Sequence, residues 1–141
     1  MPTRSELQQI SQTRLTEARA LFTAGLYDGA SCLAGYAVET ALKACICKLL
    51  DEDFPPGSGE VAKVYRTHRF DDLILLAGLR KQLMLKTADV DFQTNWSLVR
   101  SWSEAKRYEV IGSSDETKTQ ELLTALDDAA CGIITWLATI W

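Results

Sequence analysis

Residues 26–50 read LYDGASCLAGYAVETALKACICKLL, and this stretch decides the fold. Between Ala30 and Ile46 it holds only two charged residues, Glu39 and Lys43. At ~3.6 residues per turn, the stretch is long enough for about six helical turns. A helix that is apolar on nearly every side is usually buried by its neighbours. The stretch therefore predicts the central helix of an all-α antiparallel bundle.

A narrow polar line follows this predicted helix. Asp28, Ser31, Gly35, Glu39 and Lys43 succeed one another at steps of three or four residues, so they share one face. Glu39 precedes Lys43 by four residues, which is the better order for an ion pair along a helix. This pair is either a half-buried salt bridge or part of a functional site, and the helical pattern leaves both interpretations open.

Helix-capping and helix-breaking residues divide the first half of the chain into two predicted helices and an irregular stretch. Thr3 and Glu6 have the spacing of a capping box, which predicts the start of a first helix. A tight turn at residues 25–27 then joins that helix to the central one as an antiparallel hairpin. Residues 51–69 are predicted to be the main irregular stretch, because they contain Pro-Pro-Gly at residues 55–57.

Three further helices are predicted after this stretch: a short one over residues 70–79, a longer one that continues towards Tyr108, and a last one that runs to the C-terminus. Their predicted caps are Thr67, Thr87 and a capping box formed by Ser113 and Glu116. No segment alternates like a strand for more than four residues. We therefore predict a single domain over residues 1–141, built from about five antiparallel helices.

The composition is that of a globular protein. Of the 141 residues, 47% are hydrophobic and 24% are charged, which suits one domain with a real core. The net charge of −4 argues against wrapping nucleic acid through bulk electrostatics, although a local basic patch could still bind it.

The numbers of cysteine and histidine residues indicate whether a metal site is expected and in which cellular compartment the protein lies. Four cysteines and one histidine make a poor metal set, and we expect no metal and no cofactor. The cysteines have apolar neighbours and are expected to be reduced core residues, as in a cytosol. No signal peptide opens the chain, and the one membrane-like stretch carries Glu39 and Lys43 at its middle, where a bilayer penalises charge. We expect a soluble cytoplasmic protein without membrane contact.

Residues 25–44, GLYDGASCLAGYAVETALKA, resemble the signature helix of HEPN domains, which are small prokaryotic and eukaryotic helical domains. Two further pieces follow in the family's order. These are Thr67-His68 ahead of Asp72-Leu73, and Lys106-Arg107-Tyr108 ahead of the last helix. The resemblance spans nearly the whole chain. It implies an antiparallel bundle, commonly a homodimer, that either cleaves RNA or partners a nucleotidyltransferase.

By the same resemblance, RNA cleavage would use an arginine followed a few residues later by a histidine. The histidine would move a proton at the 2′-hydroxyl or the leaving oxygen, and the arginine would stabilise charge on the phosphate. Arg107 is placed to begin this motif, but residues 112–114, where the histidine is expected, read Gly-Ser-Ser. The single histidine, His68, belongs to the earlier Thr-His piece. We therefore predict a non-catalytic domain, with Arg107 and His68 as the candidates if catalysis survives.

Polar residues around this motif could hold an anion. In the family's fold Glu39 and Lys43 would face a groove bordered by Arg107 and Tyr108, whose guanidinium and phenol groups suit phosphates and bases. The same residues could instead form a structural network in which Arg107 pairs with Glu39, because a buried charge must be paired. The predicted binding residues are Glu39, Lys43, Lys63, Arg66, Arg69, Arg100, Arg107 and Tyr108.

All four tryptophans lie in the last third of the chain. Trp136 and Trp141 flank the predicted last helix, where they either fill the core or form a protein interface. Homodimerisation is the default form of such an interface.

The leading interpretation is thus a non-catalytic module that binds a nucleotide or RNA, or that partners a nucleotidyltransferase or another defence-system protein. One alternative is a metal-independent RNA-cleaving toxin of a prokaryotic toxin–antitoxin system, with a degenerate active site. Another is a structural subunit of a larger complex, contacted through the tryptophan-rich third.

Overall fold

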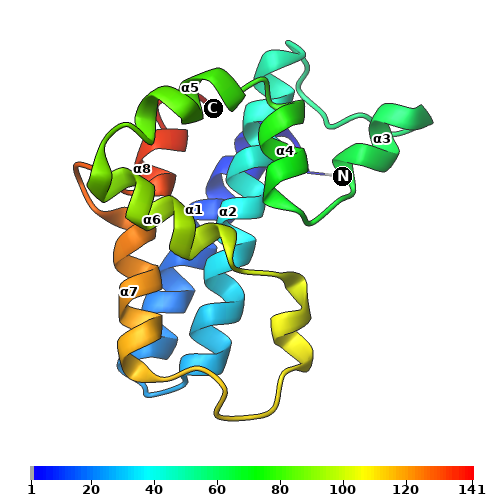
Figure 1. Ribbon diagram of the computed structural model, residues 1–141. Coiled ribbons are helices and arrows are strands. Elements are labelled where there is room, and N and C mark those ends of the chain that lie inside the picture. The colour runs from blue at the N-terminus through cyan, green and yellow to red at the C-terminus, as the bar shows by residue number, and fades with distance from the viewer. Residues whose placement is uncertain (1) are drawn as a thin grey trace.

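The computed structural model describes residues 2–141, and its helices pack around α2 (Tyr27–Leu49). α1 (Arg4–Thr23) runs beside α2 as the other arm of a long hairpin (Figure 1). The described residues form eight α-helices and one 3-10 helix and contain no strand, so the all-α prediction is confirmed.

Shorter helices cover this hairpin. α4, α7, α8 and η1 contact α2 directly, α6 packs on α7 and α8, and α3 packs on α4. These elements are α3 (Gly59–Tyr65), α4 (Phe70–Leu76), α5 (Arg80–Lys86), α6 (Val90–Arg100), the 3-10 helix η1 (Glu104–Tyr108), α7 (Glu116–Asp127) and α8 (Ile133–Leu137).

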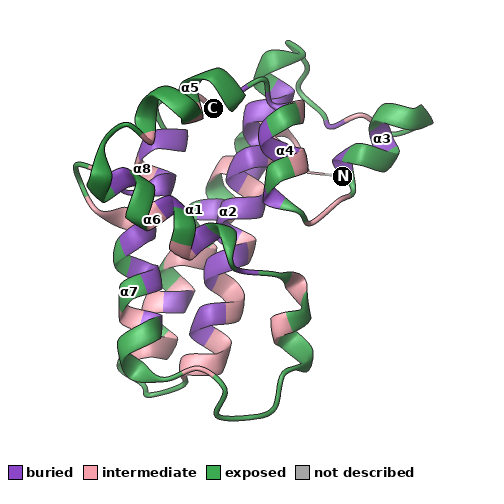
Figure 2. Cartoon of the chain, in the orientation of Figure 1, coloured by how far each residue is buried: buried purple, intermediate pink, exposed green. Residues whose placement is uncertain are grey.

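The burial of α2 follows from its composition. Its alanines let α1 come close enough for the Ser11 hydroxyl to donate to the carbonyl of Ala37 at 2.7 Å. Leu42 and Ile46 are fully buried in the main core cluster. Figure 2 shows buried segments, in purple, along α2. α2 is also long and apolar enough to cross a membrane, but 72% of the apolar window is buried inside the fold, as in the core helix of a globular protein.

Trp102 packs against Gly35 where the segment after α6 crosses α2. The indole is 5% exposed, and its Nε1 donates to the carbonyl of Ser31 at 3.0 Å. The ring also stacks on Phe70, with centroids 5.4 Å apart. A Cβ atom at Gly35 would lie 1.8 Å from the indole, so only glycine leaves room for it. This contact brings η1 over the middle of α2.

Two of the local predictions are confirmed. Thr3 and Glu6 form a reciprocal capping box, in which the Thr3 hydroxyl accepts from the Glu6 amide at 3.2 Å. Gly25 turns the chain between α1 and α2 with a φ of 76°, a left-handed conformation that favours glycine.

The number of helices differs from the prediction of about five, because two predicted helices are broken. The helix expected to continue towards Tyr108 ends at Arg100, since burial of Trp102 pulls the chain away from the helical path. The helix expected to reach the C-terminus ends at Asp127. There the side chain of Asp128 accepts from the amides of Ala130 and Cys131, both at 2.9 Å, and closes a turn before α8.

Three predicted caps are also wrong. Asp89 caps α6 in place of Thr87, and Asp115 caps α7 in place of Ser113. Aspartate has the same capping chemistry and stands two residues further along in both cases. Arg69 is the N-cap of α4, while the Thr67 hydroxyl accepts from the Arg69 amide at 3.2 Å and shapes the turn before it.

Two predicted boundaries within residues 51–86 also differ from the structure. The stretch predicted to be irregular, residues 51–69, contains the short helix α3. The helix predicted over residues 70–79 ends at Leu76, and α5 follows it.

The tryptophan-based interface prediction is wrong for Trp136. Its side chain is 5% exposed and packs edge-on against Phe92, with centroids 5.5 Å apart, so it belongs to the chain's own core. Trp141 is half-buried against a small cluster of Leu7, Ala44 and Cys47. Its role in an interface, and the homodimer itself, stay predictions.

All four cysteines are free, and Cys45 and Cys47 are buried. Burial raises the pKa of the Cys45 thiol to about 12, so this side chain stays a neutral core residue at physiological pH.

We expect Gly35→Ala to destabilise the fold by at least about 2 kcal/mol. A buried tryptophan contributes about 3–5 kcal/mol, and displacing the indole of Trp102 loses much of this, which exceeds the ~1 kcal/mol that alanine gains over glycine in a helix. Urea unfolding followed by circular dichroism measures the difference. Gly57→Ala is the matched control, because a Cβ atom there meets nothing within 4 Å. Equal stability of the two variants would contradict the role given to Trp102.

Candidate functional site

A buried carboxylate on α2 is the centre of the candidate site. Glu39 is 6% exposed, and both of its oxygens accept contacts from neighbouring side chains. Lys43 Nζ donates to Oε1 at 2.7 Å, and His68 Nδ1 lies 2.8 Å from Oε2. The predicted pair of Glu39 and Lys43 therefore exists, and His68 joins it from the loop before α4.

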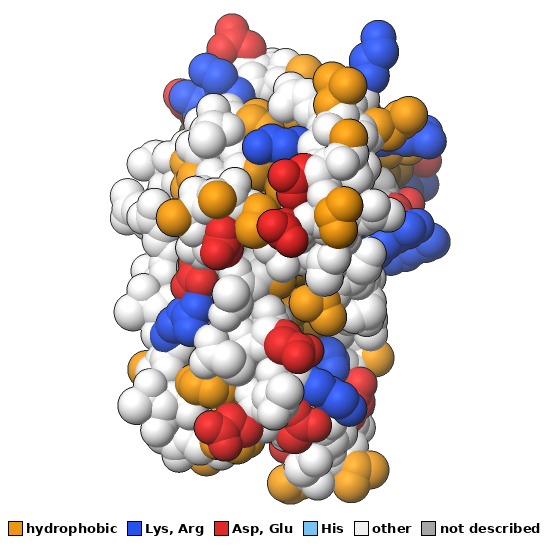
Figure 3. Space-filling model, turned by 60° about the vertical axis from the view of Figure 1, so that its left-hand side comes forward, with side chains coloured by type: hydrophobic (Ala, Val, Ile, Leu, Met, Phe, Trp, Pro, Cys, Tyr) orange, Lys and Arg blue, Asp and Glu red, His pale blue; other side chains and the backbone are white. Residues whose placement is uncertain are grey.

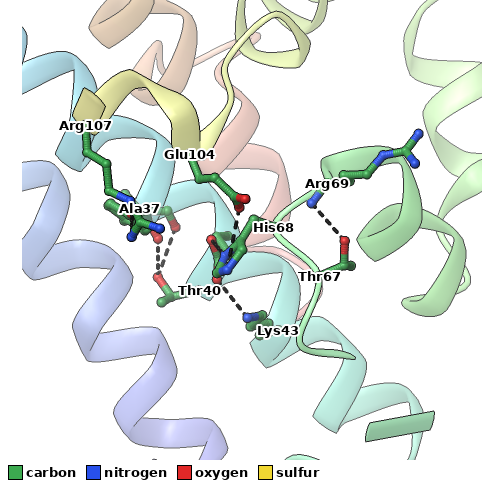
Figure 4. Close-up of polar contacts among 10 residues, drawn as sticks. Ala37, Thr40, Lys43, Thr67, His68, Arg69, Glu104 and Arg107 are labelled. Atoms are coloured by element: carbon green, nitrogen blue, oxygen red, sulfur yellow. Dashed lines mark hydrogen bonds and ion pairs between the residues drawn. The ribbon is translucent and has the colours of Figure 1, made fainter. Parts of the chain in front are cut away.

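The contact with Glu39 orients the imidazole of His68. A carboxylate only accepts hydrogen bonds, so Nδ1 carries the hydrogen and donates it. The other ring nitrogen, Nε2, then points towards η1 and lies 3.5 Å from Glu104 Oε2 (Figure 4). His68 thus links α2 to η1 through two carboxylates.

Lys43 is half-buried and contacts a second residue of the site, Tyr65. Its ammonium group lies 5.0 Å from the ring centroid of Tyr65, in addition to its bond to Glu39. Tyr65 is 2% exposed, and burial raises the pKa of its phenol well above the usual range, with Cys47 and Glu39 adding to the shift. The phenol therefore stays neutral and serves as an aromatic wall for the lysine.

Arg107 forms a second, exposed part of the site. Its guanidinium donates to the hydroxyl of Tyr36 at 3.2 Å and lies 5.0 Å from the ring centroid of Tyr108. Tyr108 is 78% exposed. The phenols of Tyr108 and then Tyr36 raise the pKa of Arg107, so the guanidinium is charged at every physiological pH.

The predicted ion pair of Arg107 with Glu39 is wrong. The carboxylate bonds to Lys43 and His68 instead, and Arg107 contacts Tyr36, which lies about one turn earlier on α2. The reason is the end of α6 at Arg100: with the helix broken, Glu104 rather than Arg107 faces His68.

The other predicted binding cations lie outside this cluster. Arg100 forms an ion pair with Asp71 at 2.9 Å, away from Glu39. Lys63 and Arg69 are exposed and turn to acidic residues on or beside their own helices, at 2.7 and 3.6 Å. Arg66 is exposed and forms no ion pair within residues 2–141. The basic loop therefore does not join the Glu39 cluster, except through His68.

Asp28 fixes the segment in which the family's histidine is expected. Its carboxylate accepts from the amides of Gly112 at 2.7 Å and Ser114 at 2.9 Å. These two backbone bonds, the one from Gly112 first, hold the pKa of Asp28 below its ordinary value. Residues 112–114 are thus a backbone anchor on the first turn of α2.

Three residues of the site were not predicted: Tyr36, Tyr65 and Glu104. Tyr36 stands three residues before Glu39 and Glu104 three before Arg107, so helical spacing could have suggested both. Tyr65 carried no such signal. Among the described residues, no group of three or more His, Cys, Asp and Glu side chains could hold a metal ion.

We expect Glu39→Ala and Lys43→Ala to be strongly coupled in a double-mutant cycle, by about 1–3 kcal/mol in the free energy of unfolding. Each single variant leaves the other group without its partner in a nearly dry environment. Glu39→Ala and Arg107→Ala should instead be additive within about 0.5 kcal/mol. The reverse ranking would mean that Arg107 is the partner of Glu39 after all.

The amide resonances of Gly112 and Ser114 should titrate with Asp28. A lowered pKa means that the ionised carboxylate is the form bound in the folded protein, so the two bonds are complete at neutral pH. They are lost as the pH falls through the folded pKa, which lies below 3.8. Nuclear magnetic resonance follows both amides, and in Asp28→Asn neither should shift over this range. A midpoint at or above 3.8 would contradict the anchor.

The comparisons with known proteins agree with the fold. The model of the HEPN domain family matches residues 5–124, which is most of the chain. No curated protein and no solved structure showed a significant match. The chain therefore belongs to the HEPN domain family.

Proposed function

We propose that this HEPN domain is non-catalytic and binds RNA or a nucleotide through Arg107 and Tyr108. The observation that carries the proposal is an exposed guanidinium held against an exposed phenol ring, with centres 5.0 Å apart. Within residues 2–141 no acidic side chain forms an ion pair with Arg107. A phosphate could therefore bind without displacing a carboxylate.

Other cationic side chains are less available than Arg107 for binding a phosphate. Lys43, Arg100 and Lys106 are each bonded to a carboxylate, at 2.7, 2.9 and 3.6 Å. Arg107 instead makes one hydrogen bond, to a neutral phenol, and its other donors remain free to form a bidentate contact with phosphate. A base would stack on the free face of Tyr108, a contact worth about 1–3 kcal/mol that tolerates any sequence.

The proposed binding would depend on a few side chains and not on the net charge of the protein. The face in Figure 3 carries side chains of both charges, interspersed with hydrophobic ones, and the net charge is −4. An RNA held mainly at Arg107 would release few counterions, so we expect a weak salt dependence, with a slope of about −0.7 per phosphate contacted on a single strand.

Two features support binding without cleavage. The segment where the family's histidine is expected offers only backbone and serine groups, and Asp28 holds it in place. The one histidine of the chain lies between two carboxylates, Glu39 and Glu104. Binding by a partner, such as a nucleotidyltransferase or another defence-system protein, is a further prediction from the family resemblance.

Residual RNA cleavage is the second candidate, and one observation favours it. Glu39 orients His68 through Nδ1, which leaves Nε2 as the ring nitrogen through which an imidazole could exchange a proton with a 2′-hydroxyl. In that case Glu104 would have to turn away for RNA to reach Nε2.

The proposal predicts that Arg107→Ala weakens RNA binding at least about tenfold, which corresponds to about 1.4 kcal/mol. Arg107→Lys should recover only part of the loss, because lysine lacks the planar fork. Fluorescence anisotropy with a labelled single-stranded oligouridine gives the affinities. Lys118→Ala is the control, since Lys118 is exposed and lies on α7 beside Asp115.

The same samples, run on a denaturing gel, test cleavage. Intact RNA supports the binding module, whereas cleavage that disappears in both Arg107→Ala and His68→Ala would establish the second candidate. Equal affinity of wild type and Arg107→Ala would overturn the proposed site.

A further inference from the structure

A groove lies between α4, α5 and α6, and its lining includes neither Arg107 nor Tyr108. It has a volume of about 380 Å³, and its lining includes the apolar side chains of Ile74, Leu75, Leu83 and Trp96. Ile74 and Trp96 are nearly buried and form its floor, while Leu75 is 58% exposed. The groove therefore offers an apolar base that no element of the chain covers.

Some charged side chains around this groove form ion pairs with other residues of the chain, and one does not. Asp71 is neutralised by Arg100 at 2.9 Å, and Asp72 lies 3.6 Å from Arg69. Arg80 also lines the groove but forms no ion pair within residues 2–141. The free charge at the rim is therefore positive, although the whole chain is negative.

α5 extends this positive rim. Its seven residues include Arg80, Lys81 and Lys86 and no acidic residue, and none of the three cations forms an ion pair in the described part of the chain. α5 buries none of its residues, and Met84 and Leu85 are 72% and 77% exposed. Unpaired cations beside exposed apolar side chains are typical of a surface that meets a partner.

We infer that this groove binds an acidic, amphipathic segment of a partner protein. Apolar side chains spaced at three and four residues would enter the groove over Trp96 and Leu83, as in helix-in-groove recognition. Aspartate or glutamate residues beside them would meet Arg80 and Lys81. This surface is separate from Arg107 and Tyr108, which lie on η1, so the inference does not depend on RNA binding.

The other partners with negative charge fit less well. RNA binding favours exposed aromatic rings for stacking, and the one aromatic residue of the groove, Trp96, is 6% exposed. A lipid surface favours a longer amphipathic helix with protruding apolar residues. Here the helix has seven residues, and the apolar base is concave.

Selection from a random library of peptides twelve residues long tests the inference. The library is applied to immobilised wild-type protein and depleted on the variant Arg80→Glu/Lys81→Glu. We expect the enriched peptides to combine acidic residues with leucine, isoleucine or phenylalanine at helical spacing. Anisotropy with the best labelled peptide should then show at least about tenfold weaker binding to that variant, because both rim charges are reversed.

Several controls make the result decisive. Arg14→Glu/Lys118→Glu has the same change in net charge on α1 and α7, and should bind the peptide like wild type. Leu75→Ser/Met84→Ser changes only exposed apolar side chains and should also weaken binding. Circular dichroism verifies that each variant is folded.

Enrichment of peptides without acidic residues, or equal binding by the rim variant and wild type, would overturn the inference. So would binding of phosphatidylserine vesicles or of oligouridine that is lost in the rim variant while no peptide is enriched, since the surface would then serve a lipid or RNA.

Discussion

The buried carboxylate of Glu39 constrains most of the structure around it. Burying an unpaired charge costs several kcal/mol, so this residue can lie in the centre of α2 only if other groups satisfy it. Lys43 satisfies one oxygen from the same helix, but the second oxygen needs a group from elsewhere. His68 supplies it, and this fixes the loop that leads into α4. Through its other nitrogen, His68 also faces Glu104, so η1 is part of the same arrangement.

The second constraint is the contact of Trp102 with Gly35. A large buried ring and a missing side chain are complementary, and together they set where the chain crosses α2 after α6. Because the crossing is fixed at Gly35, η1 begins just beyond it, with Glu104 towards His68 and Arg107 towards Tyr36. The exposed contact between Arg107 and Tyr108 thus depends on the packing of Trp102 against Gly35. The proposed binding at this surface would therefore depend on core residues that lie outside it.

The sequence predicted much of what depends on local chemistry, although it placed three helix caps two residues too early, and it missed what depends on tertiary contacts. The apolar run of α2, the capping box of Thr3 and the turn at Gly25 are local, and each was predictable. The break after Arg100 was not, because serine and tryptophan at residues 101–103 do not oppose a helix; the pocket at Gly35 decides it. The second partner of Glu39, His68, was missed for the same reason. His68 stands 29 residues away in sequence, and no periodicity connects the two.

Within this site, the residues that stabilise the fold differ from the residues that are proposed to bind a ligand. Glu39 and Tyr65 are buried, and the half-buried Lys43 contacts both, so these residues can hold the geometry without taking part in binding. Arg107 and Tyr108 are exposed and satisfy no buried group of the core, so substitutions there should change affinity more than stability. Asp28 adds a third element, because it fixes residues 112–114 through their backbone amides and leaves their side chains without a structural role in these bonds. In this chain, therefore, the segment in which the family resemblance places a catalytic histidine contributes backbone amides to Asp28, and the proposed recognition rests on Arg107, five residues before it.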